Sequence, residues 1–421
     1  MSVFKFYFSF FLILGINEIS FADHPNEGKI AISQLIEEAE QNNLEIKQTQ
    51  EHLNSLKAKL NSQYGRLSPK ISIEGGPQST KFDDEKSNGT SLYGKVEWNI
   101  YNGGFDKALI DSSKTETELQ QKRLHSLKNR VKKEVSKIYF ELQFILESIS
   151  LKQKALELNA QQLKIAKAKN SSGFTTNSDV LEFDLRESTL QSDLVLLNQQ
   201  LEQKSRDLDV MLSRKNQLAP ETVKGHLMRQ NFNFNREDLL VKIQENNDHI
   251  LLSKIELQQA KTEKRQAQSQ FLPKLDLETR YGKLANDEKV FSNKDDYAVI
   301  LKFNLPLFSG FEDYNSVKSN SAKVAASQLS IAQKNIALTA ELDATLAEIK
   351  ALNSRLDLEE KNLERSEKYY KLTLDEYKRG VKNSPDMVGA SERLLDARIR
   401  NLEYRRDLML AKAKIQELTG E

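Results

Sequence analysis

The apolar residues of this chain recur with a period that predicts very long helices. Between about 311 and 379 they repeat at alternating steps of four and three residues, which is the spacing of a coiled coil. A helix of that length extends roughly 100 Å, far beyond a compact domain. A stretch of similar length spans about 105–170. The predicted seam of the later helix consists of Leu338, Leu342, Thr345, Ile349, Leu352, Leu356, Glu359, Leu363, Ser366, Tyr370, Thr373 and Tyr377.

Each long helix is preceded by two short stretches in which apolar and polar residues alternate. A period of two is typical of a strand with two different faces. In one strand, Leu92, Val96, Trp98 and Ile100 alternate with Tyr93, Lys95, Glu97 and Asn99. The four predicted strands are about 70–76, 91–100, 274–282 and 297–308, with polar loops at 77–90 and 283–296.

The chain carries the same plan twice. The segment that begins "NNLEIKQTQ" at Asn42 is matched by "NNDHILLSK" at Asn246, 204 residues further on. The turn residues keep step at spacings of 204 to 207 residues, which indicates an internal duplication. The matched pairs are Pro69 and Pro273, Gly104 and Gly310, Gly173 and Gly380, and Asp179 and Asp386.

The duplication predicts the order of the elements. We expect a first repeat over 23–220, a connector over 221–237 and a second repeat over 238–421. Shorter helices at about 30–64, 178–214, 238–270 and 385–418 complete the two repeats. From their lengths we expect 178–214 to stack on 238–270 and 385–418 to stack on 30–64, with all four strands at one end of a rod.

The first 22 residues predict an export signal. Lys5 precedes an apolar stretch at 6–16, and cleavage is expected after Ala22. The alternative, a membrane-spanning anchor, needs about 20 apolar residues, and this stretch is too short.

Composition excludes several classes of function. The 62 basic and 61 acidic residues nearly cancel, so we expect no nucleic-acid partner. The chain has no cysteine, which excludes a thiolate metal site and an N-terminal lipid anchor. The five histidines are scattered, and no catalytic or nucleotide-binding motif is present. We therefore expect no metal, no cofactor and no enzymatic activity.

Four strands are too few to close a barrel in a membrane, where only closed barrels are tolerated. About eight is the practical minimum, so several chains must pool their strands. The apolar faces then fit lipid, and aromatic residues near strand ends fit the membrane interface. The candidates are Trp98, Tyr101, Tyr297 and Phe308. The alternative is a soluble β-hairpin packed on helices.

These features together resemble the TolC-type outer-membrane efflux proteins. The resemblance covers essentially all of the chain after the signal segment. It lies in the doubled helix–strand–strand–helix plan, in "PKISI" (69–73) and "PKLDL" (273–277), and in "YNGG" (101–104) and "LFSG" (307–310). It also lies in the element G-x5-D-[VM]-[LV], which begins at Gly173 and again at Gly380.

The resemblance implies a mainly α chain with a membrane β-barrel part. It implies a homotrimer with a 12-stranded barrel in the outer membrane on a long periplasmic α-helical barrel. The implied partners are a periplasmic membrane-fusion adaptor, an inner-membrane transporter of RND or ABC type, and outer-membrane lipid. The implied function is the exit duct of a tripartite efflux pump or a type I secretion system, for small toxic compounds or proteins. The alternative is a periplasmic coiled-coil adaptor or scaffold.

The resemblance also implies a gate at the periplasmic tip. Its members would be Tyr377 and Lys382, with Ser178 and Asp179 as partners and Asp386 as a ring of carboxylates. A second acidic ring of the family falls on Gly389 and is missing. The implied adaptor-docking turns contain Gly173, Phe174, Gly380 and Val381.

The same residues also have a purely structural interpretation. Gly173 and Gly380 suit helix C-termini. Ser384 and Pro385 suit an N-cap followed by a first helical position, and the helix dipole alone favours Asp179 and Asp386 nearby.

Overall fold

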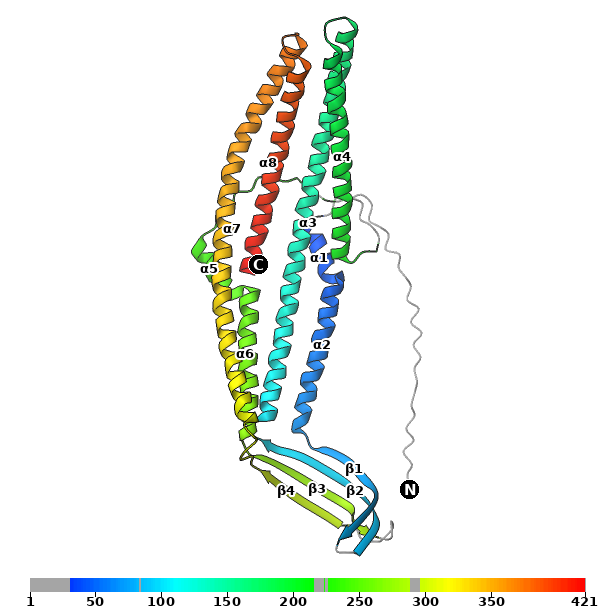
Figure 1. Cartoon of the computed structure of the whole chain (residues 1–421), viewed down its shortest axis with the longest axis vertical. Coiled ribbons are helices and arrows are strands. Elements are labelled where there is room, and N and C mark those ends of the chain that lie inside the picture. Colours follow the sequence, from blue (N-terminus) through cyan, green and yellow to red (C-terminus); the bar gives the residue numbers. More distant parts are fainter. Residues whose placement is uncertain (1–30, 83–84, 216–222, 224–225, 288–295, 421) are drawn as a thin grey trace.

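The structure is a computed structural model that describes residues 31–82, 85–215, 223, 226–287 and 296–420. Figure 1 shows an elongated molecule with a four-stranded sheet at one end and two helix–helix turns at the other. The predicted export signal lies outside the described residues. Within the described part, no helix is both long enough and apolar enough to cross a membrane.

Two helices of 67 residues each form the length of the rod: α3 (Phe105–Ser171) and α7 (Glu312–Lys378). Each turns back into a 36-residue helix, α4 (Asn177–Leu212) or α8 (Ser384–Thr419). The seam predicted on α7 is buried at Leu338, Leu342, Thr345, Ile349, Leu352, Leu356, Thr373 and Tyr377. At Glu359, a polar position of the seam, the carboxylate instead accepts from Arg400 of α8 at 3.3 Å.

The remaining helices occur in pairs, because an asparagine interrupts each predicted helix. The pairs are α1 (Ile32–Asn42) with α2 (Leu44–Tyr64), and α5 (Arg236–Asn246) with α6 (Asp248–Gln268). Asn43 and Asn247 both accept hydrogen bonds from the first backbone N–H groups of the helix that follows. The predicted continuous helices 30–64 and 238–270 are therefore wrong at these two positions.

The same asparagines decide which helices stack. The Asn43 side chain donates to the carbonyl of Met211 at the end of α4, and Asn247 donates to that of Leu418 at the end of α8, both at 2.9 Å. The return helix of each repeat therefore stacks on the N-terminal helix pair of its own repeat (Figure 1). The predicted stacking across repeats is wrong, since these buried hydrogen bonds join partners that helix lengths alone cannot identify.

The sheet has the order β1-β2-β3-β4 and is antiparallel throughout. Its strands are β1 (Lys70–Phe82), β2 (Glu85–Asn102), β3 (Lys274–Asp287) and β4 (Asp296–Asn304). Pairing continues to Phe82 and Glu85, so most of the predicted loop 77–90 is strand. The prediction failed because the backbone groups of polar residues pair as well as those of apolar ones. β4 ends earlier than predicted, just before Pro306, which has no N–H to donate.

The two faces of the sheet differ as predicted. On one face Ile71, Ile73, Val299, Leu301 and Phe303 are each 61% exposed or more. The opposite face carries paired charges: Lys95 contacts Glu74 at 3.1 Å and Glu97 at 2.5 Å, and Glu278 contacts both Arg280 and Lys302.

A β-bulge lies between Asn99 and Tyr101. Because Ile100 is the extra residue, Tyr101 becomes the partner of Leu275 and joins the apolar face beside Trp98.

The structure shows the duplication in individual contacts. Lys59 of α2 contacts Glu116 of α3 at 2.9 Å, and Glu263 of α6 contacts Lys323 of α7 at 3.2 Å. These pairs occupy equivalent positions with the charges exchanged. At the start of the long helices, the left-handed residues Gly103 and Gly104 correspond to Gly310 and Phe311. The structural counterpart of Gly310 is therefore Gly103, one residue before the sequence match.

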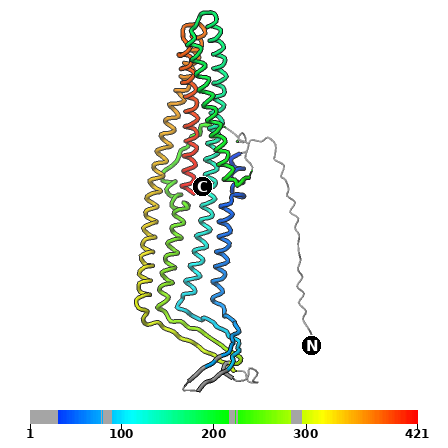
Figure 2. The backbone as a smooth tube through the Cα atoms, turned by 45° about the vertical axis from the view of Figure 1, so that its right-hand side comes forward, coloured from blue at the N-terminus to red at the C-terminus, as the bar shows by residue number. Residues whose placement is uncertain are grey.

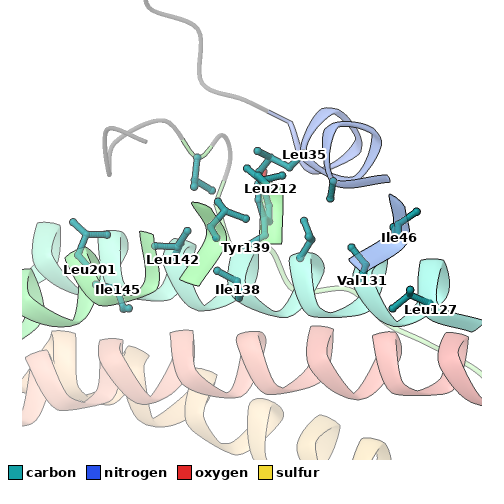
Figure 3. Close-up of a cluster of buried hydrophobic side chains, with 14 of the residues drawn as sticks. Leu35, Ile46, Leu127, Val131, Ile138, Tyr139, Leu142, Ile145, Leu201 and Leu212 are labelled. Carbon is teal, nitrogen blue, oxygen red and sulfur yellow. The ribbon is translucent and has the colours of Figure 1, made fainter. Parts of the chain in front are cut away.

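The core divides between the repeats rather than forming one centre. One cluster joins α1, α2, α3 and α4 through Leu35, Val131, Tyr139, Leu142 and Leu212 (Figure 3). A second joins α5, α6, α7 and α8. Residues of the connector cross between them: the Leu227 N–H donates to Glu147 of α3 at 2.7 Å, and Arg229 contacts Asp357 of α7 at 2.6 Å. Figure 2 shows the resulting curved rod from a second direction.

Candidate functional site at the helical tip

The tip of the rod consists of two turns that need glycine. Gly173 and Gly380 have φ values of 76° and 81°, a left-handed conformation that glycine adopts without strain. The N–H of the following residue bonds back to the ending helix, Phe174 to Lys169 and Val381 to Glu376, both at 2.9 Å. The side chains of Phe174 and Val381 are 84% and 69% exposed. The predicted docking turns therefore present two apolar side chains to solvent.

Each return helix begins with the same capping arrangement. Thr176 is the N-cap of α4 and Asn383 is the N-cap of α8. The third residue of each helix, Asp179 or Asp386, bonds back to its N-cap residue. The predicted N-cap at Ser384 is therefore wrong by one residue, because the Asn383 side chain satisfies the N–H of Asp386 at 3.1 Å. The structural interpretation of both aspartates as capping residues is otherwise confirmed.

Asp179 does more than cap its helix. Its Oδ2 accepts from the Thr175 hydroxyl at 2.6 Å and the Thr176 hydroxyl at 2.8 Å. Its Oδ1 accepts from the backbone N–H of Ser384, in the other turn, at 3.2 Å. These bonds, that from Thr175 first, hold the pKa of Asp179 well below its usual range. A charged carboxylate of the first repeat thus holds the backbone of the second.

Tyr377 is buried where the two hairpins meet. Its ring packs edge-on against Phe183 with centroids 5.9 Å apart. The Lys169 amine lies 4.4 Å from the ring centroid and donates to the backbone carbonyl of Tyr377 at 2.7 Å. Burial raises the pKa of the Tyr377 phenol, and the nearby Ser384 hydroxyl offsets part of this effect.

The predicted partners are only partly brought together within one chain. Asp179 lies near Tyr377, but its hydrogen bond to the second repeat goes to Ser384. Lys382 lies 3.9 Å from Asp386 of its own turn, and the predicted pair with Asp179 is not formed within the described chain. Ser178 is exposed. The assignment of these five residues to a gate between copies stays a prediction.

Three contacts between the hairpins were missed from the sequence. Besides Lys169, they involve Gln162, which donates to the Tyr370 hydroxyl at 3.3 Å, and Arg186, which donates to Glu392 at 2.8 Å. Their partners lie more than 200 residues away, where no periodicity connects them. The one available signal was a basic residue in the last turn of α3, which the helix dipole favours for its own reasons.

The predicted interface aromatics lie toward both ends of the sheet. Tyr297 lies at the loop end of β4 and is 79% exposed. Trp98 and Tyr101 lie near the helical end of β2, and Phe308 follows β4 at that end. The Trp98 Nε1–H donates to the Leu67 carbonyl at 3.0 Å, so the polar edge of an otherwise exposed ring is satisfied.

The site supports closure and contact rather than bond-making chemistry. Among the described residues, no group of three or more histidine, aspartate or glutamate side chains could hold a metal ion. What the tip contains is a set of reversible polar contacts between two long hairpins. Such contacts can hold the hairpins together and release them.

A sheet with one apolar face, set on paired long hairpins joined at their tips, defines a subunit of the outer-membrane channel class. The chain belongs to the outer membrane efflux protein family, whose profile matches residues 35–214 and 239–421. Membership in this family disfavours the alternative of a periplasmic adaptor or scaffold. No curated protein sequence gives a significant match.

Solved structures establish the fold. The CmeC outer membrane channel of Campylobacter jejuni is 16% identical with a TM-score of 0.81, over 100% of this chain and 93% of that one. The outer membrane protein VceC of Vibrio cholerae is 15% identical with a TM-score of 0.79, over 92% and 96%. The open state of the Neisseria gonorrhoeae MtrE outer membrane channel is 15% identical with a TM-score of 0.79, over 92% and 88%.

Proposed function

We propose that three copies of this chain form the exit duct of a tripartite efflux pump or a type I secretion system. Their twelve strands close a barrel in the outer membrane, and their helices form a tunnel across the periplasm. A membrane-fusion adaptor and an inner-membrane transporter of RND or ABC type deliver small toxic compounds or proteins, which leave without catalysis by the duct. Export uses the signal segment that ends at Ala22, and no lipid anchor is attached.

The observation that carries the proposal is the contrast between the faces of the sheet. A sheet packed on helices would bury its apolar face, yet Ile71, Ile73 and Phe303 are 67% to 80% exposed. The opposite face carries ion-paired charges suited to a water-filled lumen. Membrane lipid is the medium in which such an exposed apolar face is stable.

We place the gate and the adaptor contact at the tip. Asp179 and Tyr377 hold the two hairpins of one copy together, Asp386 forms the carboxylate ring, and Lys382 reaches Ser178 and Asp179 of the next copy. The adaptor binds the two turns through Phe174 and Val381, whose exposure supports a docking role.

Fractionation and mass measurement test the duct. The protein should remain in the outer membrane after a high-salt wash and require detergent for extraction. Its mass in detergent should equal three processed chains. Release by salt, or a mass of one chain, would contradict the proposal.

Planar-bilayer recording tests the gate. Asp179→Ala and Lys382→Ala should each raise single-channel conductance, because each removes a contact that closes the tip. Glu187→Ala is the matched control, since its carboxylate accepts only a helix-internal bond from Gln191 among its described contacts. If both gate variants conduct like the control, the gate assignment is wrong and the duct is unaffected.

A further inference from the structure

The two flanks of the molecule are repeat counterparts of an interface already present inside it. Within the chain the repeats meet where α3 contacts α6 and α8, and where β2 pairs with β3. Figure 1 shows α7 and β4 on one flank and α2, α4 and β1 on the other. The duplication makes α7 and β4 the counterparts of α3 and β2. It makes α2, α4 and β1 the counterparts of α6, α8 and β3.

Individual contacts fix this correspondence residue by residue. The hydrogen bond from Asn43 to Met211 matches that from Asn247 to Leu418. It sets a spacing of 204 residues between α2 and α6, and 207 between α4 and α8. The matching ion pairs of α2 with α3 and of α6 with α7 give 204 and 207 again. Each residue of the internal interface thus has an identifiable counterpart on a flank.

Polar side chains dominate the internal interface at mid-height. Asp248 of α6 is 8% exposed and interacts with three residues of α3. Its carboxylate lies 2.7 Å from the Lys122 amine, 3.0 Å from the Asn129 amide and 3.3 Å from His125 Nδ1. Beside this group, Lys133 of α3 contacts Glu417 of α8 at 2.7 Å.

Their counterparts on the flanks are all apolar. Leu44 of α2 replaces Asp248, and Val210 of α4 replaces Glu417. They are 67% and 69% exposed. On α7, the residues at the positions of Lys122, His125, Asn129 and Lys133 are Leu329, Ala332, Ile336 and Ala340. Leu329 and Ile336 are 71% and 72% exposed. Large apolar side chains are thus exposed at the positions that would meet if the internal interface were repeated between copies.

We propose that Leu44 and Val210 of one copy pack on Leu329, Ile336 and Ala340 of the next, in the geometry that Asp248 and Glu417 have inside the chain. This inference rests on the proposed three-copy assembly and adds its register. The result is an apolar seam at mid-height of each boundary between copies, alternating with a polar seam inside each copy.

The difference between the two seams has a physical reason. Inside one chain, covalent connection brings Asp248 to Lys122 and its neighbours, so the ion cluster does not have to drive association. Separate copies must find each other, and the hydrophobic effect favours association in proportion to the apolar area removed from water. Buried ion pairs between copies would contribute little net affinity, because desolvation offsets their attraction.

Cross-linking tests the register, and the chain has no cysteine of its own to interfere. The pair Leu44→Cys and Ile336→Cys, treated with a short bis-maleimide, should give a ladder of two and three linked chains on denaturing gels. The control pair is Leu44→Cys with Leu358→Cys, because Leu358 is also exposed on α7 but lies roughly 33 Å further along the helix. The control should run as a single chain.

The two proposals fail in different ways. If the protein has the mass of three chains but the Leu44 and Ile336 cysteines do not link, the register is wrong and the duct stands. If the protein has the mass of one chain, the assembly itself is wrong and the register falls with it. Linkage by the control pair as strong as by the test pair would also overturn the register.

Transplanting the internal seam gives a second test. Leu44→Asp should raise the dissociation constant of the assembly by more than roughly tenfold, because it buries an unpaired carboxylate between copies. The secondary structure of the chain should be unchanged, since Leu44 is exposed within it. Adding Leu329→Lys and Ile336→Asn should restore assembly by rebuilding the partners of Asp248. Assembly of Leu44→Asp at the wild-type level, or no rescue by the added changes, would overturn the proposal.

Discussion

Asn247→Ala should loosen the joint at which α8 stacks on α6. The Asn247 side chain is 2% exposed and accepts from the N–H groups of His249 and Ile250 at 2.9 Å and 3.3 Å. It also donates to the Leu418 carbonyl at 2.9 Å. The substitution removes a helix cap from α6 and a partner from the end of α8 at the same time.

The expected cost follows from these two losses. Losing an N-cap side chain costs about 1 kcal/mol. Leaving the buried Leu418 carbonyl without its donor costs a further 1–3 kcal/mol, approximately. Together the loss is about 2–4 kcal/mol, so local opening of the joint should become roughly 30-fold to several hundred-fold more frequent.

Hydrogen–deuterium exchange with mass spectrometry measures this opening. Peptides covering the start of α6 and the end of α8 should exchange faster by that factor, while peptides at the tip turns should not change. Asn246→Ala is the control, since Asn246 is the exposed neighbour. Unchanged exchange at the joint, or equal acceleration by Asn246→Ala, would refute the role given to Asn247.

Three further outcomes are expected. Gly103→Ala should cost about 2–5 kcal/mol in thermal unfolding, because the added Cβ would lie 2.4 Å from a carbonyl oxygen at a φ of +67°. Gly104→Ala, with open space around it, should cost only about 1–2 kcal/mol. Because the pKa of Asp179 is lowered, its stabilising charge is present above its ordinary value and is lost only as pH falls through the lowered one. Wild-type conductance should therefore not rise between pH 7.5 and 5, and a rise that Asp179→Asn abolishes would contradict this. Lys169→Met should raise the open probability in planar bilayers roughly fivefold by removing the donor to the Tyr377 carbonyl, whereas Lys169→Arg should restore most of the closure.

The elements could be predicted from the sequence because their signals are local. Gly173 and Gly380 mark the tip turns, and both have the left-handed conformation that the sequence indicated. The seam from Leu338 to Leu356 is buried because its spacing matches the helix period. The two-faced strands followed from a period of two, apart from the bulge at Ile100, which no alternation of residue types reveals.

The stacking order and the tip contacts could not be predicted, because they depend on pairs distant in sequence. Asn43 and Asn247 look like ordinary breaks in a helix, and only the fold reveals the carbonyl that each one meets. The bond from Ser384 to Asp179 involves a backbone N–H, which residue types do not encode. The resemblance correctly directed attention to Asp179, while its partner inside the chain came from geometry.

The exchanged charges of the two long-hairpin ion pairs have a consequence for folding. A chain made of two similar halves risks pairing an element with the wrong half. If α2 took the place of α6 beside α7, Lys59 would face Lys323, and α6 beside α3 would set Glu263 against Glu116. Exposed pairs of this kind contribute only about 0.2–1 kcal/mol when correct, but like charges in contact reverse the sign. The reversed polarity therefore acts as a label that distinguishes one half from the other during assembly of the chain.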